Sequence, residues 1–374
     1  MCSSDLMWLS TMGGESEIPG AFVAPITTHA QREQHSWSER GAIALRALWN
    51  RSAAAAIERL IEDFSPDVVH AHKLYPQLSV APLMVAERKG IPIVQTVHDY
   101  EFISANPTDA TGGRVDKTES RLQYRALNSV LFGVKRRFHV PAVDEWVAVS
   151  RSVSSRYSAA GIECTVLPNF TPHLVASPRG HSERHGITYV GRLTSEKGVR
   201  DLVEVTRRLP RVQVRLAGGG PLENELRAAT REVSNLKLLG TLPASRVRQL
   251  LAESLICVMP SRWEEPGALV CLESMACGTP VVAYEVGGLV EYVGDARAGV
   301  TVEKDPIALA NACAELLGDR AKWEALSEHA LRAAKTTHAP ETYVASITNV
   351  YQRAVAGNAR DGGRVHTTKP GTPW

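Results

Sequence analysis

The chain has 374 residues, of which 44% are hydrophobic and 22% are charged. This length predicts about two domains, and the composition is that of a globular protein, which excludes a disordered or fibrous chain. The formal net charge is only +2, so the molecule lacks the strong positive field of a nucleic-acid-binding protein, and we expect no nucleic-acid partner.

The cysteines and the apolar runs indicate the compartment. The six cysteines form no Cys-x-x-Cys pair, and several stand in apolar runs such as SLICVMP, where a thiol behaves as a small hydrophobic group. No run approaches the roughly 18 apolar residues that span a bilayer, and the chain does not open with a basic and then apolar leader. We therefore expect a cytoplasmic protein.

The start of the chain is unusual. Residues 1–6 read MCSSDL, which the end of a sequencing adaptor encodes in one reading frame, so we interpret them as an artefact. Only one or two short predicted strands, LMWLST and AFVAP, precede the first long predicted helix. We therefore expect an N-terminal domain over 7–170 that is truncated.

The first half alternates short β-branched runs with stretches of helical spacing. The predicted strands are 67–72, 91–99, 145–150 and 163–169. Helices are predicted at 41–63 and 76–89, and Gly90-Ile91-Pro92 is a stop signal that a new strand follows. This order predicts a parallel sheet that is covered by helices on both faces.

The second half repeats this alternation after a stretch rich in Pro, Ser, Gly and His at 171–186, which we interpret as the linker. The predicted strands are GITYVGR, VQVRLAG, LKLLG, LICVMPS, PVVAY and GVTV. Strands in this order predict a doubly wound, Rossmann-like domain over 187–338. A closing helix is expected at 339–356 and a disordered tail at 357–374.

Polar side chains follow strands of the second half, where an open α/β sheet binds its ligands. Arg192 and Lys197 come directly after GITYVG, and two cations with helix N-terminal amides suit a diphosphate. Taken alone, an Arg and a Lys in a loop are more often solvated surface residues, so we expect removal of either to leave folding intact.

A Gly-Gly-Gly-Pro turn follows the next predicted strand, at 218–221. Glu223 stands where the third glycine of a dinucleotide fingerprint would fall, and a carboxylate there would repel a pyrophosphate. The sequence therefore disfavours a nicotinamide dehydrogenase. A tight turn and a position near a nucleotide are equal interpretations of this loop.

The strongest pattern is EEPGALVCLESMACGTPVVA at 264–283. Glu265 follows a predicted strand, and Pro266 is expected to open a helix that carries Glu273 among apolar neighbours. Eight residues on a helix rise about 12 Å, more than the roughly 5–5.5 Å between the carboxylates of a retaining glycosidase. We therefore interpret the two carboxylates as contacts to different parts of one long ligand, with ribose hydroxyls as partners of Glu273.

In this order the motifs resemble the retaining family 4 glycosyltransferases of GT-B architecture. The resemblance rests on YVGRLTSEKG, the Gly-Gly-Gly-Pro turn, the Glu-x7-Glu pattern, MACGTPVVA with VGGLVEYV, and in the first half DVVHAHKLYP, IPIVQTVHDY and TVLPNF. It covers about residues 60–340. It implies two Rossmann-like domains that face a cleft, a nucleotide-diphosphate-sugar as co-substrate, and no cofactor.

The resemblance also implies roles for individual residues. It places His98 by the reacting centre as the catalytic residue, whereas a capping histidine after a strand is the alternative. The implied donor-binding residues are Gly191, Arg192, Lys197, Gly220, Glu265, Gly267, Ala268, Leu269 and Glu273. The implied acceptor-side residues are Asp99, Tyr100 and Asn169.

Two features depart from the family pattern. Gly267 and Ala268 stand where the family has a bulky residue and a glycine, so the sugar contacts are expected to differ. The family's N-terminal glycine-rich loop has no clear counterpart, and 12–15 (Met-Gly-Gly-Glu) is the nearest match. No Asp-x-Asp pair occurs, and His70 and His72 lack a third ligand in sequence, so we expect no metal.

The implied reaction is retaining transfer to a hydroxyl of a glycan, polysaccharide or glycolipid, driven by electrostatic stabilisation of the leaving group. Segment 111–140 carries seven basic and two acidic residues and predicts either an anionic membrane contact on the inner face or a solvated basic helix. A nucleotide-sugar epimerase of the same fold and a non-catalytic nucleotide-sugar-binding fragment are the alternative functions.

Overall fold

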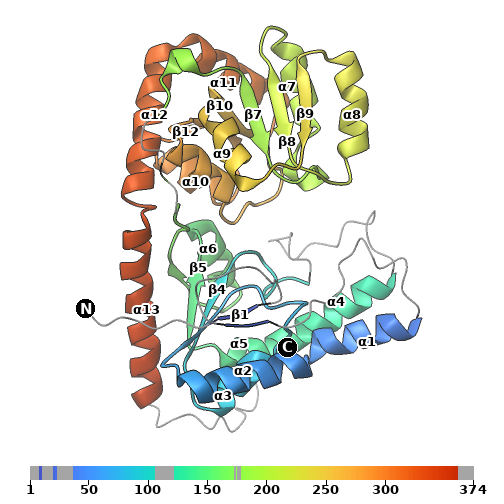
Figure 1. The fold of residues 1–374 in the computed structure, drawn as a ribbon, viewed down its shortest axis with the longest axis vertical. Helices are drawn as coiled ribbons and strands as arrows, with labels where there is room; N and C mark the ends of the chain where they lie inside the picture. The colour runs from blue at the N-terminus through green and yellow to red at the C-terminus, as the bar shows by residue number, and fades with distance from the viewer. Residues whose placement is uncertain are drawn as a thin grey trace. The chain divides into compact units, whose positions relative to one another are not determined.

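The computed structural model describes residues 8–10, 20–22, 37–105, 122–171, 174 and 178–360. The chain divides into two compact α/β units (Figure 1). The first unit holds the described residues up to Ala148, Arg156–Thr165 and the chain from Ile347, and the second holds Val149–Ser155 and Val166–Ser346. Two parallel-stranded units confirm the predicted pair of Rossmann-like domains.

The first unit is built on a four-stranded sheet. Its strands, in spatial order, are β3 (Val69–Ala71), β4 (Ile93–Val97), β5 (Glu145–Ala148) and β6 (Thr165–Val166). The described pairings of β3 with β4 and of β4 with β5 are parallel, and every residue of β4 is buried. A separate parallel pair joins β1 (Trp8–Ser10) and β2 (Gly20–Phe22). Each predicted strand of this half forms, over a shorter span than its apolar run.

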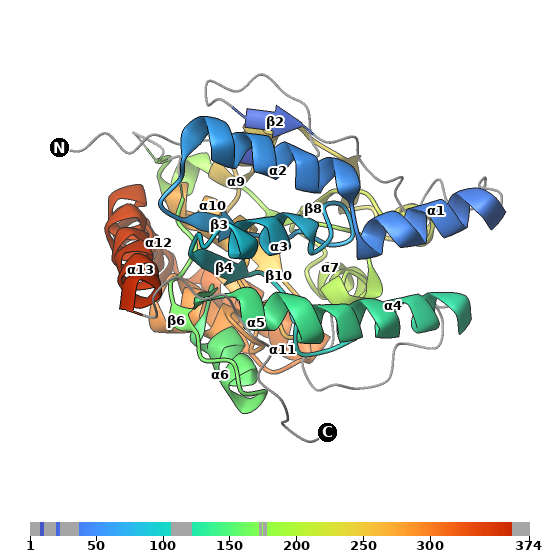
Figure 2. The same ribbon diagram turned by 90° about the horizontal axis from the view of Figure 1, so that it is seen from below.

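Helices cover this sheet. Helices α2 and α3 lie side by side (Figure 2). The helices are α1 (Trp37–Leu48), α2 (Arg51–Phe64), α3 (Ala81–Arg88), α4 (Leu122–Val134), the π-helical turn η2 (Lys135–His139) and α5 (Val140–Ala142). Two further helices, α6 (Arg151–Ala159) and α13 (Pro340–Arg360), begin in the second unit and end in the first.

Two helix predictions in this half were wrong in their bounds. The helix predicted at 41–63 is two helices, because Asn50 Oδ1 accepts the N–H of Ala53 at 3.1 Å and caps a new helix. The helix predicted from residue 76 begins at Ala81, because Ser79 has φ +61° and interrupts the helical backbone.

The second unit is a six-stranded, fully parallel sheet. Its strands, in spatial order, are β12 (Gly299–Val302), β11 (Val281–Tyr284), β10 (Ile256–Met259), β7 (Ile187–Val190), β8 (Val214–Ala217) and β9 (Leu236–Gly240). The chain runs from β7 outward to β9, then restarts beside β7 with β10 and runs outward the other way. This reversal of strand order confirms the doubly wound fold and creates a switch point between β7 and β10.

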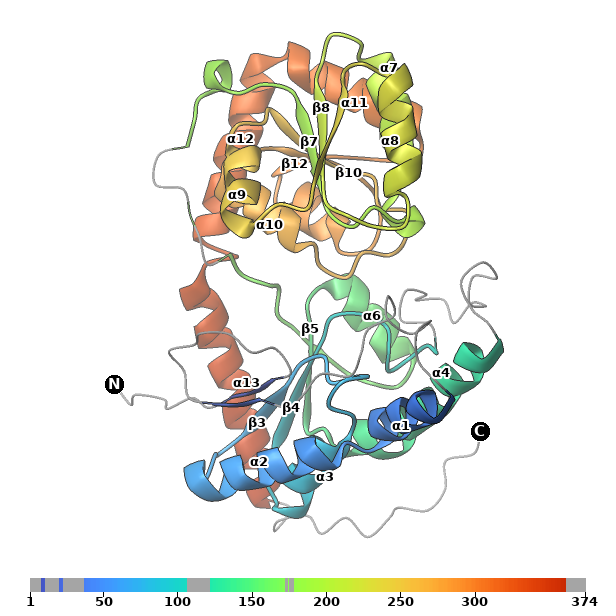
Figure 3. The ribbon, with the colours of Figure 1, turned by 45° about the vertical axis from the view of Figure 1, so that its right-hand side comes forward.

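Helices lie on both faces of this sheet (Figure 3). The helices are η3 (His181–Glu183), η4 (Ser195–Lys197), α7 (Asp201–Arg208), α8 (Glu223–Glu232), α9 (Ala244–Ala252), α10 (Leu269–Ala276), the π-helical turn η5 (Val290–Asp295), α11 (Pro306–Gly318) and α12 (Arg320–Lys335). Helix α10 packs against α9 and α12, and helix α7 packs against α11. Within the part of the chain that the structure describes, no helix is long and apolar enough to cross a membrane.

Candidate active site

Lys197 and Glu265 meet at the switch point of the second unit. Lys197 Nζ lies 2.7 Å from each carboxylate oxygen of Glu265. Ser261 Oγ and Trp263 Nε1 also donate to Glu265 Oε2, each at 2.9 Å. Only 8% of the Glu265 side chain is exposed. The buried carboxylate is therefore held by three donors that come from the ends of β7 and β10.

The alternative interpretation of Lys197, a solvated surface residue, does not hold. Only 17% of its side chain is exposed, and its ammonium lies 5.3 Å from the centroid of the Trp263 ring. Both the carboxylate of Glu265 and the face of the indole attract a cation at this distance. Sequence alone did not show that the partner of Lys197 stands 68 residues further along the chain.

Arg192 has a different setting, although it lies in the same loop. Its side chain is 63% exposed and its nearest acidic partner is Glu196, with an N···O distance of 3.4 Å. An exposed pair of this kind contributes about 0.5 kcal/mol at most. The guanidinium can therefore leave Glu196 for a stronger anion at little cost, whereas its backbone is fixed by a 2.7 Å hydrogen bond from Tyr189 Oη to Arg192 O.

The loops that follow β7 and β8 are joined through their backbones. Leu193 N donates to Gly219 O at 3.0 Å, and Leu222 N donates to Leu193 O at 3.0 Å. A Cβ atom on Gly220 would lie 2.6 Å from Leu193 O, and one on Gly218 would lie 1.8 Å from the carbonyl oxygen of Gly191. The glycines are therefore required by close backbone approach, which favours the tight-turn interpretation. A contact of Gly191 or Gly220 with a nucleotide stays a prediction.

Helix α10 begins at Leu269, so the prediction that Pro266 opens it was wrong. Gly288 N donates to Glu265 O at 2.6 Å, and the residue before the helix, Ala268, is extended with φ −88° and ψ 103°. The first turn of α10 leaves its N–H groups without acceptors inside the helix. Leu269 is 60% exposed there, and Glu273 lies one turn later, half-buried, on the helix where the sequence predicted it.

A side chain on Gly267 would crowd its neighbours, so the bulky residue that the family carries at this position would require them to move. A Cβ atom there would lie 3.1 Å from Val149 Cγ2, 3.2 Å from Asn169 Nδ2 and 3.3 Å from Tyr292 Oη. The Tyr292 hydroxyl in turn donates to Val149 O at 2.8 Å and accepts from Asn169 N at 3.0 Å. Asn169, predicted on the acceptor side, is thus placed beside Gly267, and Tyr292 is a site neighbour that the sequence did not reveal.

His98 follows β4 in the first unit and belongs to a group of three histidines. Its Nε2 lies 2.9 Å from His72 Nδ1, and the two rings stack with centroids 5.2 Å apart. His70 lies next to His72, with ring centroids 4.4 Å apart, and its nitrogens bind Tyr351 Oη and Thr96 Oγ1, each at 2.8 Å. Sequence reasoning gave His70 and His72 structural roles and did not foresee that His72 contacts His98.

Desolvation keeps these rings neutral. Burial, with the neighbouring histidines, lowers the pKa of His70 from 6.5 to about 3 and the pKa of His72 from 6.5 to about 4. The surrounding protein also desolvates the His98 ring and lowers its pKa, although part of this side chain stays open to solvent. Among the residues that the structure describes, no group of three or more His, Cys, Asp or Glu side chains is arranged to hold a metal ion.

The other predicted acceptor-side residues, Asp99 and Tyr100, are buried. Asp99 forms an ion pair with Lys73, and its Oδ1 accepts the N–H of Glu101 at 2.9 Å. Tyr100 is fully buried, so its ring belongs to the core of the first unit. Tyr157 Oη donates to Asp99 O at 2.9 Å. The structure thus gives both residues a place in the core, and a role toward an acceptor stays a prediction.

Part of the predicted basic membrane segment, 111–140, is buried. Lys135 Nζ lies 2.6 Å from Glu101 Oε2 and 4.5 Å from the Tyr75 ring centroid, so this charge is compensated inside the protein. Arg136 and Arg137 are exposed. Positions 111–121 of this segment, the candidate glycine loop at 12–15 and the tail beyond Arg360 lie outside the described residues.

Comparisons with known proteins agree with this geometry. Residues 184–319 match the family described as Glycosyl transferases group 1, and residues 22–173 match the family described as Glycosyltransferase Family 4. Alpha-maltose-1-phosphate synthase of Mycolicibacterium smegmatis is 31% identical over 68% of this chain and 70% of that protein. The 2-deoxystreptamine N-acetyl-D-glucosaminyltransferase of Streptomyces fradiae is 28% identical over 75% of this chain and 69% of that protein.

Solved structures share the fold. HepE of Anabaena, crystallised with UDP and glucose, superposes with a TM-score of 0.64 at 19% identity and covers 90% of this chain and 86% of that one. Sucrose-phosphate synthase of Thermosynechococcus elongatus superposes with a TM-score of 0.63 at 20% identity, over 81% of this chain and 77% of that one.

Proposed function

Since the chain belongs to family 4 of the glycosyltransferases, enzymes of the GT-B fold, we propose that it transfers a sugar from a nucleoside-diphosphate sugar to a hydroxyl group with retention of configuration. The observation that carries the proposal is the Lys197–Glu265 pair at the switch point between β7 and β10. Open α/β sheets bind their ligands there.

The diphosphate is the first group that the site explains. Arg192 is exposed beside Lys197, and the N-terminus of α10 begins four residues after Glu265. Two cations and a helix N-terminus neutralise phosphate oxygens as charge develops on the leaving group. This arrangement supports catalysis without a metal ion.

The carboxylates of Glu265 and Glu273 are assigned to the uncharged parts of the donor, the sugar and the ribose. Glu265 is oriented by Ser261 and Trp263, so its carboxylate is fixed before a ligand arrives and can accept hydrogen bonds from the donor sugar. Glu273 lies one turn into α10 and is assigned to the ribose hydroxyls, as the family resemblance implies.

In the reaction, the acceptor oxygen bonds to the anomeric carbon on the face that the diphosphate leaves. The bond between that carbon and the phosphate oxygen breaks, and the acceptor proton passes to a phosphate oxygen. His98 orients the sugar as a neutral imidazole, which its lowered pKa favours. The acceptor is a glycan, polysaccharide or glycolipid hydroxyl. Four buried cysteines, Cys257, Cys271, Cys277 and Cys313, form no disulfide among the described residues, which supports a cytoplasmic location, at the inner face of the membrane for a lipid-linked acceptor.

A donor panel tests the proposal. The protein is incubated with uridine, guanosine, adenosine and thymidine diphosphate sugars, and release of nucleoside diphosphate is followed with and without added acceptors and with a chelator. We expect release with one nucleotide class, unchanged by the chelator, and an anomeric configuration in the product that matches the donor by NMR. Conversion of the donor sugar without an acceptor would favour an epimerase, and donor binding without turnover would favour a non-catalytic binder.

A further inference from the structure

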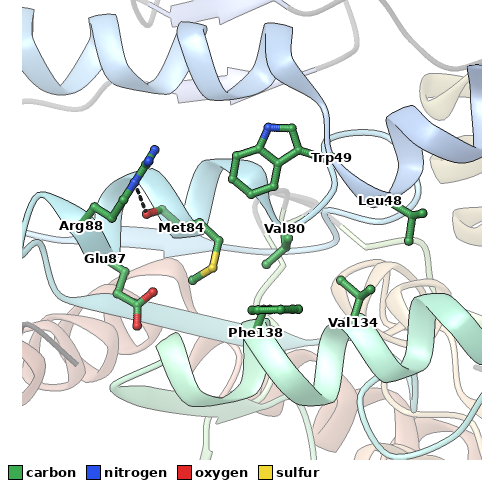
Figure 4. A pocket seen from close by; sticks show the side chains of 8 residues that line it. All are labelled: Leu48, Trp49, Val80, Met84, Glu87, Arg88, Val134 and Phe138. Carbon is green, nitrogen blue, oxygen red and sulfur yellow. Dashed lines mark hydrogen bonds between the residues drawn. The ribbon is translucent and has the colours of Figure 1, made fainter. Parts of the chain in front are cut away.

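An apolar pocket of about 360 Å³ opens on the first unit between the end of α1, helix α3 and the junction of α4 with η2 (Figure 4). Its apolar lining residues are Leu48, Trp49, Val80, Met84, Val134 and Phe138. Trp49 and Phe138 lie on opposite sides of the pocket (Figure 4), and Glu87 and Arg88 complete its lining. None of these residues takes part in the proposed transfer reaction.

Large apolar side chains around this pocket are open to solvent. Leu45 is 69% exposed, Val130 is 53% exposed, Phe138 is 46% exposed and Trp49 is 42% exposed. They come from α1 and its end and from the α4–η2 helix, two segments that pack against each other. An exposed apolar patch of this kind on a folded protein marks a surface that is covered by a partner.

Two of the three segments that line the pocket carry only basic charges, whereas α3 contributes one acidic and one basic residue, Glu87 and Arg88. No acidic residue occurs in 42–51 or in 122–140. Arg51, Arg136 and Arg137 are exposed, and none of them has an ion-pair partner among the residues that the structure describes. Arg137 Cζ lies 5.4 Å from the centroid of the Phe138 ring, so a cation accompanies the exposed aromatic group.

We propose that this face, the Trp49–Phe138 pocket with its flanking arginines, docks on an anionic lipid bilayer. Aromatic side chains settle at the level of the lipid headgroups while apolar side chains enter the acyl boundary. The arginines then meet lipid phosphates. A second copy of the chain fits less well, because a symmetric contact would bring the same arginines of both copies together.

This surface extends the segment that the sequence predicted, 111–140, because it adds residues of α1 and α3 to Val134, Arg136, Arg137 and Phe138. Lys135 of that segment does not contribute because it is paired with buried Glu101. The proposal is also independent of the transfer reaction, since lipid binding needs no donor.

Cosedimentation with vesicles tests the proposal. The full chain is mixed with vesicles of phosphatidylcholine alone or of phosphatidylcholine with phosphatidylglycerol, and the bound fraction is measured over a range of lipid concentrations. We expect binding to the anionic vesicles that weakens as salt is added. Replacing both exposed arginines (R136Q with R137Q) should weaken it about thirtyfold, since each basic residue near the surface contributes about 1 kcal/mol.

The apolar part of the contact is tested by the double variant Trp49→Ala with Phe138→Ala, which should bind less to the anionic vesicles than the wild type does. The arginine variant should keep the thermal unfolding midpoint of the wild type. The control for the aromatic variant is Ile307→Ala with Leu239→Ala, and the control for the arginine variant is Arg211→Gln with Arg231→Gln. All four control residues are exposed and lie elsewhere on the chain. Equal binding to neutral and anionic vesicles, or an equal loss in the controls, would overturn the proposal. A dimer in solution that the Trp49 and Phe138 changes dissociate would overturn it too, in favour of self-association.

Discussion

The strand ends of the two units differ in electrostatic character. In the second unit they are charged and paired, as in the 2.7 Å contact of Lys197 with Glu265. In the first unit the Asp99–Lys73 ion pair is accompanied by imidazoles whose pKa values are lowered by burial, to about 3 for His70 and about 4 for His72. Fixed charges suit a diphosphate whose charge grows during the reaction. Neutral imidazoles can exchange hydrogen bonds with hydroxyl groups without adding charge.

The largest expected effect comes from removing the cation of the second unit. Lys197→Ala should lower kcat by about a hundredfold to a thousandfold, because a preorganised charge at the diphosphate is lost. It should also lower the free energy of unfolding by about 1–3 kcal/mol, since buried Glu265 loses one of its three donors. Donor turnover and urea unfolding measure the two effects. Wild-type turnover in a folded Lys197→Ala protein would contradict the assignment.

Close backbone packing beside Lys197 gives the next effect. Gly198 has φ +66°, and a Cβ atom there would lie 1.8 Å from Pro260 O, so Gly198→Ala must displace the backbone at the end of β10. We expect a loss of about 3 kcal/mol or more in the free energy of unfolding. Gly240→Ala is the matched control, because Gly240 has φ +68° but nothing within 4 Å of its Cβ position. It should cost only about 1 kcal/mol, and equal losses would show that packing is not the cause.

The first unit should be the acid-sensitive one. Burial, with nearby Lys135, lowers the pKa of His139 from 6.5 in the unfolded chain to about 3. The folded state therefore binds fewer protons than the unfolded state, so stability is complete above pH 6.5 and falls as the pH drops toward 3. At pH 5 this one group should cost about 2 kcal/mol.

The check is the slope of unfolding free energy against pH for wild type and His139→Gln, which keeps an N–H donor for Gln95 Oε1, the 2.9 Å partner of His139 Nε2. We expect a shallower slope between pH 6.5 and 5 in the variant. An unchanged slope would mean that His139 already titrates normally in the folded protein.

The smallest expected effect is that of an exposed pair close to Lys197 in sequence. Arg200 and Glu225 form a 2.7 Å ion pair in which each side chain is 52% exposed. Arg200→Ala should therefore change the free energy of unfolding by about 1 kcal/mol at most and leave donor turnover at the wild-type rate. A large loss of turnover would mean that the charged region extends onto α7.

Sequence reasoning identified the fold and several site positions because strand ends are local and periodic. Arg192, Lys197 and Glu265 each follow an apolar run, and a parallel sheet brings such positions to one edge. The family resemblance supplied their roles, which stay predictions.

Features that depend on distant contacts were not predictable. Trp263 and Ser261 stand in a loop without periodicity, so nothing local showed that both donate to Glu265. Pro266 misled the prediction of α10, which begins three residues later, and nothing local showed that Glu265 O accepts the N–H of Gly288. Asn50 is the exception, since an Asn before a helical stretch is a local cap signal that could have divided the first helix.

The central claim is that the second unit binds the donor diphosphate and that His98 of the first unit acts in turnover. Its most direct test is calorimetric titration with free nucleoside diphosphates. The proteins titrated are wild type, Arg192→Ala, Lys197→Ala and His98→Ala. The account predicts that wild type binds one nucleotide class, that both second-unit variants lose most of this affinity, and that His98→Ala binds as wild type does while turnover falls. Loss of nucleotide affinity in His98→Ala with wild-type affinity in Lys197→Ala would contradict it.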